Sequence, residues 1–353
     1  MAHSKNIRKI NHPKIGRDPA MPARTPLVSI IILNWNGKQD TLECLSSMQN
    51  ITYPNFSIIV ADNGSTDDSV DSIRNAYPDV FIFENGANLG FAEGNNHAIT
   101  YAFDNGADAV VILNNDIIVD PEILNFFYSA FDSLPKPGIL GTVSFYYDKP
   151  DVIWAAGGEW DATRLELKHI CCNEREEDLP SKEPYSVNYA IGCALFVHRS
   201  VVEKIGLMDP LFFLNFEEND WCQRAIKSGL INYTVPNAKI WHKVSSSFGG
   251  ESPLWKYYMT RNLLLWSKRH LPPAEYRAVV NKTIREFLPH KTPINTDKKL
   301  SLKYHYWALF DYLKQFKKRF ESPFYLAQFF GIVHYFFRRF GPCPESTQQR
   351  LRK

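Results

Sequence analysis

The chain has no long hydrophobic run and no segment typical of a secretory signal. A membrane-spanning helix needs about 18 consecutive apolar residues, whereas the longest aromatic and aliphatic run, residues 329–337, is much shorter and ends before Arg338 and Arg339. The N-terminus also lacks the apolar run of about 7–15 residues that a signal peptide contains. These absences predict a chain that neither crosses a membrane nor is exported.

Cysteine spacing and net charge exclude further classes of protein. The six cysteines show neither a disulfide framework nor a zinc-type CxxC pair, which predicts a reduced, cytosolic chain. A formal net charge of +2 gives no reason to expect a nucleic-acid partner. Hydrophobic content of 44% and charged content of 22% are ordinary for a globular protein. At 353 residues, the chain can bury one large core or two modest ones.

The first 25 residues differ from the rest of the chain. They contain six basic residues against one acid, Asp18, together with three prolines. Too little apolar surface is present there for the segment to fold alone. Residues 1–25 are therefore predicted to be a disordered basic leader.

From residue 27 onward, strand and helix patterns alternate. Continuous apolar runs at 27–33 and 109–113 are typical of parallel strands covered on both faces. Further strands are expected at 57–62 and 80–83, and a helix over 91–105. This order predicts an α/β fold with a doubly wound, mostly parallel central sheet, which binds ligands at the carboxyl ends of its strands.

The second half of the chain changes character twice. Residues 139–198 are more β-like, with a strand expected over 189–197, and helices rich in aromatic and basic residues follow residue 251. We therefore divide the chain after its leader into a domain over 26–250 and a helical region over 251–353.

Asp62 ends the second predicted strand. Its carboxylate could accept hydrogen bonds from a base or ribose, but an Asp before Asn63-Gly64 is also typical of a simple turn, and the residue types favour the turn. Ser65 and Asp68 are candidates for a capping box that starts the next helix.

Glycines and amides cluster where a loop enters the helix predicted over 91–105. Asn88, Gly90 and Asn95 belong to this cluster. A helix start of this kind leaves backbone N–H groups free to meet a phosphate. A glycine-rich turn with a cap explains the same residues equally well.

Asp116 follows the most apolar strand, beside Asn114 and Asn115. Mg²⁺ and Mn²⁺ prefer oxygen ligands, usually one or two carboxylates together with substrate phosphates. A solvated loop carboxylate is the alternative. The position at a strand end makes the metal role as credible as the loop role.

Glu217, Glu218 and Asp220 cluster at a predicted helix start. Acids in a first turn are explained by the helix dipole alone. One of them could instead be a general base whose pKa is raised by acidic neighbours and burial. The surrounding aromatic residues indicate a sheltered site, so we favour the base.

Two later residues have open roles. His242 follows a short apolar strand and is either a metal ligand through a neutral ring nitrogen or a structural residue. Arg261 either anchors a phosphate or packs within the helical region.

The ordered set of these segments resembles family 2 glycosyltransferases with a GT-A fold. The nearest subgroup is the rhamnosyltransferase-like enzymes of bacterial cell-surface polysaccharide synthesis. The likeness covers residues 27–270. The segments that carry it are 29–36, 62–67, 88–96, 113–116, 192–199, 216–222, 242–244 and 257–262.

The resemblance implies a role for each matching residue. Asp62 would contact the nucleotide base, and Asp116 would be the last acid of a DxD-type metal motif in which Asn114 replaces the first Asp. Glu218 would stand at the position of the catalytic base, beside Glu217, with Asp220 in reserve. His242 would approach the metal or the diphosphate. The remaining donor-binding candidates are Asn36, Asn88, Gly90, Asn95, Asn115 and Arg261.

The activity that the resemblance implies is an inverting transfer of a sugar, with rhamnose as a candidate. The donor would be a nucleotide-diphosphate sugar, the acceptor a hydroxyl of a glycan or lipid-linked sugar, and the cofactor Mg²⁺ or Mn²⁺. A sugar nucleotidylyltransferase would need a Gly-rich basic loop after the first strand, which residues 34–37 do not supply. A non-catalytic membrane-associated adaptor with the same fold has no need of Asp116 or Glu217-Glu218.

Residues 302–340 alternate aromatic and basic side chains. Such helices suit the headgroup layer of an anionic membrane. The alternative is a helical cap on the catalytic domain, or a homodimer contact. A lipid-linked acceptor favours the membrane, and would place the enzyme on the inner face of the cytoplasmic membrane.

Overall fold

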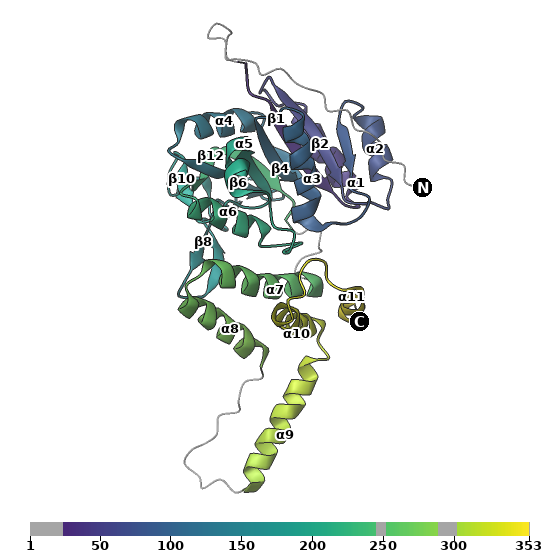
Figure 1. Cartoon of the computed structure of the whole chain (residues 1–353), viewed down its shortest axis with the longest axis vertical. Helices are drawn as coiled ribbons and strands as arrows, with labels where there is room; N and C mark the ends of the chain where they lie inside the picture. The colour runs from purple at the N-terminus through teal and green to yellow at the C-terminus, as the bar shows by residue number, and fades with distance from the viewer. Residues whose placement is uncertain (1–23, 245–251, 289–301, 353) are drawn as a thin grey trace, which may run out of the picture.

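The computed structural model describes residues 24–244, 252–288 and 302–352 (Figure 1). The basic leader predicted over 1–25 lies almost wholly outside the described residues. The same is true of residue 250, where we placed the boundary between the two regions.

Four parallel strands form one half of a large sheet, in the order β3-β2-β1-β4. Their apolar side chains are almost completely buried in β1 and β4, as expected for strands covered on both faces. Helices connect each strand to the next. The elements of this half are β1 (Val28–Asn34), α1 (Lys38–Met48), β2 (Phe56–Asp62), α2 (Ser69–Ala76), β3 (Phe81–Glu84), α3 (Gly90–Asp104) and β4 (Ala109–Asn114).

The other half of the sheet mixes strand directions. β11 runs antiparallel between β4 and β6, and β12 runs parallel to β6. A separate hairpin is formed by β8 and β9. The elements are β5 (Ile117–Val119), α4 (Ile123–Ser133), β6 (Pro137–Tyr146), β7 (Ile153–Ala155), β8 (Gly158–Asp161), β9 (Glu166–His169), η1 (Glu176–Asp178), β10 (Tyr185–Val187), β11 (Ala194–His198), α5 (Arg199–Ile205), α6 (Glu217–Lys227) and β12 (Ile231–His242).

The predicted α/β class with a mostly parallel central sheet and C-terminal helices is confirmed, and two local predictions are wrong. The hydroxyl of Ser65 does not cap a helix, because it donates to the carboxylate of Asp62 instead. Helix α2 begins at Ser69, and its N-cap, Asp68, makes no side-chain capping bond. The strand expected over 189–197 starts only at Ala194, since Tyr189 forms an isolated bridge with Gly158.

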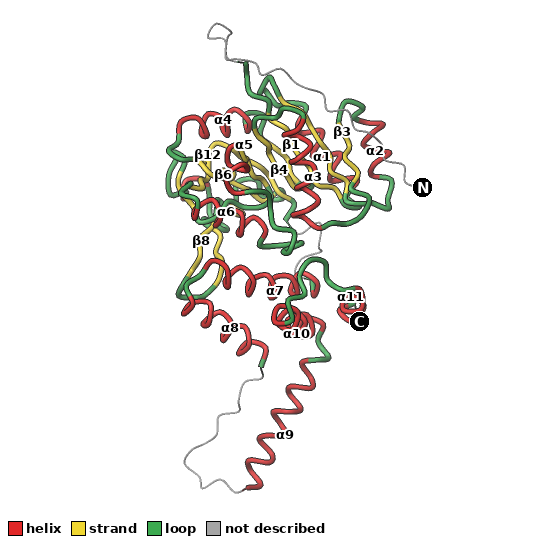
Figure 2. Tube along the Cα trace, viewed as in Figure 1, coloured by secondary structure: helices red, strands yellow, loops and turns green. Residues whose placement is uncertain are grey.

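Helices make up the described chain after residue 252 (Figure 2). α10 packs across α7 (Figure 1), and a Cβ added at Gly331 would come within 2.9 Å of the Tyr257 carbonyl oxygen, so the two helices touch backbone to backbone at this crossing. No described helix is long and apolar enough to cross a bilayer. The helices are α7 (Pro253–His270), α8 (Pro273–Phe287), α9 (Leu302–Arg319), α10 (Pro323–Phe336) and α11 (Glu345–Leu351).

Candidate active site

Polar side chains gather where the parallel strands end. The register pairs Asn34 with Asp62 and Leu33 with Asn114, so β1, β2 and β4 end at one edge of the sheet. The carboxyl ends of parallel strands are where α/β sheets bind their ligands. Asn36, Asp62, Asn115 and Asp116, which sequence reasoning selected, therefore all lie at this edge.

Asp62 organises the turn that follows β2. One carboxylate oxygen accepts from Asn34 Nδ2 at 2.8 Å and from the Ser65 hydroxyl at 2.6 Å. The other accepts from the backbone N–H groups of Gly64 and Ser65. The side chain is buried, with 3% exposed. The contacts of its carboxylate are those expected of a turn-forming Asp.

Asn36 joins this turn to the loop after β1. Its φ of 51° lies in the left-handed region, which Asn tolerates better than most residues. Its side-chain oxygen accepts from the Thr66 N–H at 2.7 Å, and its own N–H donates to the Ser65 hydroxyl. The two loops are thus held together as one unit.

The start of α3 does not have the free N–H groups that its sequence suggested. The N–H groups of Leu89, Gly90 and Phe91 donate to Asn63 Oδ1, Asn88 Oδ1 and the Phe213 carbonyl oxygen. Gly90 has a φ of 79°, and a side chain there would collide with Phe213. These contacts match the glycine-rich turn with a cap.

Asn95 and Asn115 both face inward. Asn95 is fully buried and donates to the Phe91 carbonyl oxygen. Asn115 Nδ2 lies 3.0 Å from Thr41 Oγ1, and the absence of a Cβ at Gly37 leaves room for it. Asn115 therefore braces the loop after β1 against the acidic turn.

Asp116 and His242 meet in a buried pair. His242 Nε2 lies 3.1 Å from Asp116 Oδ1, and the two side chains are 7% and 3% exposed. The register of β12 with β5 places His242 opposite Ile117, next in the chain to Asp116. The N–H of Lys243 also donates to the Asp116 carbonyl oxygen at 3.0 Å. Two residues that are far apart in sequence are thus brought together.

Lys243 ties this pair to α1. Its ammonium group lies 2.8 Å from Asp40 and 2.6 Å from Glu43. Burial lowers the pKa of Lys243, but the hydrogen bonds that its ammonium group donates to these two carboxylates outweigh burial, so the net change in pKa is upward. Lys243 is therefore a fixed positive charge beside the acidic turn.

The second acidic segment starts α6. Phe216 adopts a left-handed conformation with φ 75°, and Glu217 behind it is 4% exposed. Burial raises the pKa of Glu217 well above its usual range, with the charge of Glu218 adding to the effect. Burial also raises the pKa of Glu218 to about 7, although Asn219 Nδ2 donates to its carboxylate at 2.6 Å. Glu218 itself is half-buried.

The start of β11 lies between the two acidic segments. A Cβ added at Gly192 would sit 3.2 Å from the Glu218 carboxyl carbon. The next residue, Cys193, accepts at its carbonyl oxygen from the Asn114 N–H at 3.0 Å. Burial raises the pKa of the Cys193 thiol to about 12, and the charges of both Asp116 and Glu218 contribute to the rise. The Gly192–Cys193 segment therefore contacts Glu218 through Gly192 and Asn114, two residues before Asp116, through Cys193, so the two acidic loops converge.

Asp220 faces away from that convergence. Its carboxylate lies 2.8 Å from Arg224 Nε, 2.8 Å from His270 Nε2 and 3.2 Å from Arg269 Nη1. Burial raises the pKa of Asp220, but hydrogen bonds from His270 and Arg224 outweigh it, and the net shift is downward. Its visible contacts bind the first turn of α6 to the end of α7.

Arg261 is fully buried, and most of its hydrogen bonds go to backbone carbonyl oxygens. It donates to the carbonyl oxygens of Phe212 at 2.8 Å and Gly341 at 2.6 Å. Asn262 Nδ2 donates to three carbonyl oxygens of the same loop, those of Phe212, Leu214 and Asn215. Together the two side chains hold the segment that leads into Glu217.

Sequence reasoning missed several residues around the acids. Gly192 and Cys193 lie inside a segment that was selected only for its general likeness. Trp154 was not selected, yet its ring centroid lies 4.8 Å from that of His242. A lone Trp in a β-like region carries no signal of such a position.

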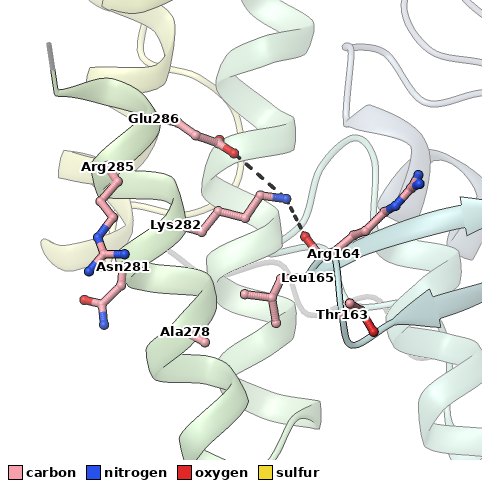
Figure 3. A pocket seen from close by; sticks show the side chains of 8 residues that line it. All are labelled: Thr163, Arg164, Leu165, Ala278, Asn281, Lys282, Arg285 and Glu286. Carbon is pink, nitrogen blue, oxygen red and sulfur yellow. Dashed lines mark hydrogen bonds and ion pairs between the residues drawn. The ribbon is translucent and has the colours of Figure 1, made fainter. Parts of the chain in front are cut away.

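A separate cavity of about 420 Å³ lies between the β8–β9 turn and α8 (Figure 3). Arg164, Lys282 and Arg285 line it, and Lys282 Nζ donates to the Arg164 carbonyl oxygen at 2.6 Å. None of the predicted site residues borders this cavity. It is therefore distinct from the acidic site.

Within the described ranges, no group of three or more His, Cys, Asp or Glu residues is placed to hold a metal ion. Asp116 and His242 offer one oxygen and one nitrogen ligand. This donor set fits a divalent ion that takes its other ligands from a substrate diphosphate and water.

The sheet and its helices have the GT-A fold, as comparison with solved structures shows. Among solved structures, a mannosyltransferase from Pyrobaculum calidifontis in complex with GDP-Man and Mn²⁺ aligns with a TM-score of 0.53 and 15% identity, covering 90% of this chain and 89% of that one. GalNAc-T7 with UDP, GalNAc and Mn²⁺ aligns with a TM-score of 0.58 and 16% identity, over 84% and 58%. At these identities, the likeness concerns the fold.

The family profile for glycosyl transferase family 2 matches residues 29–206, just over half of the chain. An N-acetylglucosaminyl-diphospho-decaprenol L-rhamnosyltransferase of Mycobacterium tuberculosis is 26% identical over 64% of this chain and 78% of its own length. The dTDP-rhamnosyl transferase RfbF of Shigella flexneri is 23% identical over 69% and 80%. The chain belongs to glycosyl transferase family 2 and is a glycosyltransferase that uses a nucleotide-sugar donor.

The contacts of Asp220 predict a stability role. Asp220→Asn leaves Arg224 and His270 without their carboxylate and removes one of the two carboxylates that Arg269 contacts. We expect a loss of about 3 kcal/mol in the free energy of unfolding in urea. Because the pKa of Asp220 is lowered by folding, its contribution is present above about pH 4 and declines below it. The difference in stability between the wild type and Asp220→Asn should therefore shrink on acidification.

Asp71→Asn, at an exposed pair with Arg74, is the control and should change stability by less than about 0.5 kcal/mol. Equal effects of the two substitutions would contradict the assignment.

Proposed function

We propose that this chain is an inverting, metal-dependent transferase that moves a sugar from a nucleotide diphosphate to a hydroxyl group of a glycan or lipid-linked acceptor. The observation that carries the proposal is the convergence of the two acidic segments on Gly192 and Cys193. Gly192 lies against the Glu218 carboxyl group, and the Cys193 carbonyl oxygen accepts from the N–H of Asn114, two residues before Asp116. One carboxylate is paired with an imidazole, and the other has a raised pKa and partial exposure. The first suits the leaving diphosphate and the second suits the incoming alcohol.

The donor is proposed to lie along the edge formed by β1, β2 and β4. Asn36 and Asp62 would shape the loops that receive the nucleotide, with Asn115 between them and the diphosphate. Asn88, Gly90 and Asn95 would support this side from α3, and Arg261 would act at a distance by holding the loop before α6. Asp116 and His242 would hold a Mg²⁺ or Mn²⁺ ion, which supplies Lewis-acid stabilisation of the diphosphate as charge builds on it.

Glu218 is proposed as the base. Its carboxylate accepts the proton of an acceptor hydroxyl while that oxygen forms a bond to the anomeric carbon. The bond between the anomeric carbon and the diphosphate oxygen breaks at the same time, and the nucleoside diphosphate leaves with the electron pair. Attack from the face opposite the leaving group inverts the anomeric centre. Glu217, next to it in the chain and more deeply buried, is an alternative base, with Asp220 in reserve.

Rhamnose is our proposed sugar, because the relatives from Mycobacterium tuberculosis and Shigella flexneri are named as rhamnosyltransferases. The first of these names also contains a lipid diphosphate, which supports a lipid-linked acceptor. A non-catalytic adaptor is not favoured, since it gives no reason for a half-buried carboxylate with a raised pKa.

The proposed base gives a prediction for turnover. Glu218→Gln should lower kcat by about 10²–10⁴-fold, the usual contribution of positioned proton transfer, while donor binding measured by thermal shift is kept. Glu217→Gln, one residue away, is the matched control and should lose less. Because the base works when deprotonated and the pKa of Glu218 is about 7, kcat/KM in the wild type should fall as the pH drops below 7. Near-normal turnover of Glu218→Gln would exclude it as the base and leave Glu217 or Asp220.

The proposed metal site gives a second prediction. The wild-type protein should melt at a higher temperature with Mn²⁺ and a nucleoside diphosphate than with either alone, since ligands bound only by the native state stabilise it. Asp116→Ala should abolish this rise and the turnover while the fold is kept. Asp40→Asn, which touches Lys243 but lies outside the pair, is the control. Unchanged turnover in EDTA would contradict the metal role.

Contact with a membrane surface is proposed for residues 302–340. Four consecutive residues, Phe336 to Arg339, are exposed, with Phe336 at 54% and Phe337 at 73%. Two aromatic rings beside two arginines suit the interface of an anionic bilayer. Lys314 and Lys317 on α9 add positive charge to this part of the chain. The acceptor would then be met at the inner face of the cytoplasmic membrane.

Co-sedimentation with phosphatidylglycerol vesicles tests this contact. The double substitution Phe336→Ser, Phe337→Ser should weaken binding by at least about tenfold, because each buried Phe contributes about 1.5–3 kcal/mol. Ile226→Ser removes an exposed apolar side chain from α6 and should leave binding unchanged. A wild-type chain that stays in the supernatant would disprove the contact.

A further inference from the structure

Trp154 stands beside the converging acids, and the proposed function does not use it. It belongs to β7, which pairs with β6 at Ser144 and Phe145. β11 pairs with an earlier part of β6, at Leu140 and Gly141, so β7 continues the sheet beyond the start of β11. This position lies past the end of β4, next to Asp116.

The two faces of β6 have different surroundings here. On one face, Phe145 packs with Ile153 and with Trp241, whose ring centroid is 6.1 Å away, in a closed apolar cluster. On the other face, Ser144 Oγ lies 3.5 Å from Cys193 Sγ. Trp154 meets His242 edge to face at 4.8 Å, which places its ring on the face of the acids.

A second aromatic ring lies next to that of Trp154. His169, at the end of β9, lies 5.1 Å from Trp154 in an edge-to-face arrangement. Burial lowers the pKa of His169, with a backbone contact to Trp154 opposing the shift. Its imidazole is therefore neutral near pH 7 and can both donate and accept a hydrogen bond.

Neighbouring aromatic rings form a row that starts at His242, continues through Trp154 and His169, and runs toward Glu218. The ring of Tyr189 lies 6.5 Å from that of His169. Tyr189 lies three residues before Gly192, and a Cβ added at Gly192 would sit 3.2 Å from the Glu218 carboxyl carbon, so the row of rings ends close to that carboxylate. Trp154 and His169 are half-buried, whereas Tyr189 is buried behind them.

We propose that Trp154 and His169 form the platform on which the sugar ring of the acceptor stacks, so that one of its hydroxyl groups faces Glu218. This deepens the proposed function and rests on it. A sugar ring has an apolar face of C–H groups and an edge of hydroxyls. Aromatic faces with a few polar groups match that combination. Trp154 offers the face, and its indole N–H has no acceptor among the hydrogen bonds of the described residues.

The position distinguishes acceptor from donor. The loops that carry Asn36 and Asp62 follow β1 and β2, on one side of β4 in the sheet order. β6 and β7 lie on the other side of β4. A ring stacked on Trp154 is thus separated from the nucleotide edge by the acidic turn at Asp116, where the donor sugar would be transferred.

Binding is tested first without any donor. In the full chain labelled with ¹⁵N at tryptophan, the indole signal of Trp154, assigned by its loss in Trp154→Phe, should shift on titration with methyl glycosides of common hexoses. n-Butanol, which has a hydroxyl but no ring, should leave it unmoved. A Trp154 signal that no glycoside shifts would overturn the platform.

Kinetics provide the second test, with dTDP-rhamnose as donor, Mn²⁺, and a glycoside that shifts the signal as acceptor. Trp154→Ala should raise the acceptor KM by about tenfold or more, as expected for an interface tryptophan, and by more than it raises the KM for the donor. Trp154→Phe should recover part of the loss. Trp241→Ala, on the opposite face, should leave the acceptor KM unchanged.

An acceptor KM that is equal in wild type and Trp154→Ala would refute the platform while leaving the transferase intact. Glycoside binding at Trp154 without release of nucleotide from any nucleotide sugar would instead uphold the platform and refute the transferase. The two failures are therefore distinguishable.

Discussion

The placement of β11 against β4 is the constraint on which the site depends. Its antiparallel register sets Ala194 opposite Leu113, and this fixes Gly192 and Cys193 just beyond the acidic turn. Gly192 has no side chain, so Glu218 can lie directly over it. A different register would turn alternate side chains to the opposite face of the sheet, and the carboxylates of Asp116 and Glu218 would no longer share their surroundings.

Burial and ionic partners distinguish the charged groups around the site. Asp116 is matched with His242, and Lys243 is matched with two carboxylates of α1. Asp220 has three cationic or potentially cationic neighbours, and folding lowers its pKa. Glu218 has none of these, and burial raises its pKa. Neighbouring carboxylates on one helix turn are thereby given opposite proton affinities, which separates a structural acid from a reactive one.

The fold was largely predictable because buried parallel strands have a simple pattern. The apolar runs that became β1 and β4 could hardly form anything else between turn residues. The site was predictable only in part. Acids at strand and helix ends can be recognised from their position in the sequence. The N–H of Phe91, in contrast, donates to the carbonyl oxygen of Phe213, which lies more than a hundred residues away. Trp154 reaches His242 through a strand pairing that no local pattern reveals. Long-range contacts of this kind are decided by packing.

Side chains of α7 hold α6 in two places, at the loop that precedes it and at its first turn. Arg261 and Asn262 fasten the loop before Glu217, and His270 and Arg269 fasten its first turn through Asp220. The family profile ends at residue 206, before any of these contacts. The residues that match the family profile and the residues that position the Glu218 carboxylate therefore lie in different parts of the chain. Exchanging the C-terminal helices between related enzymes would alter reactivity even where every substrate-facing residue is retained.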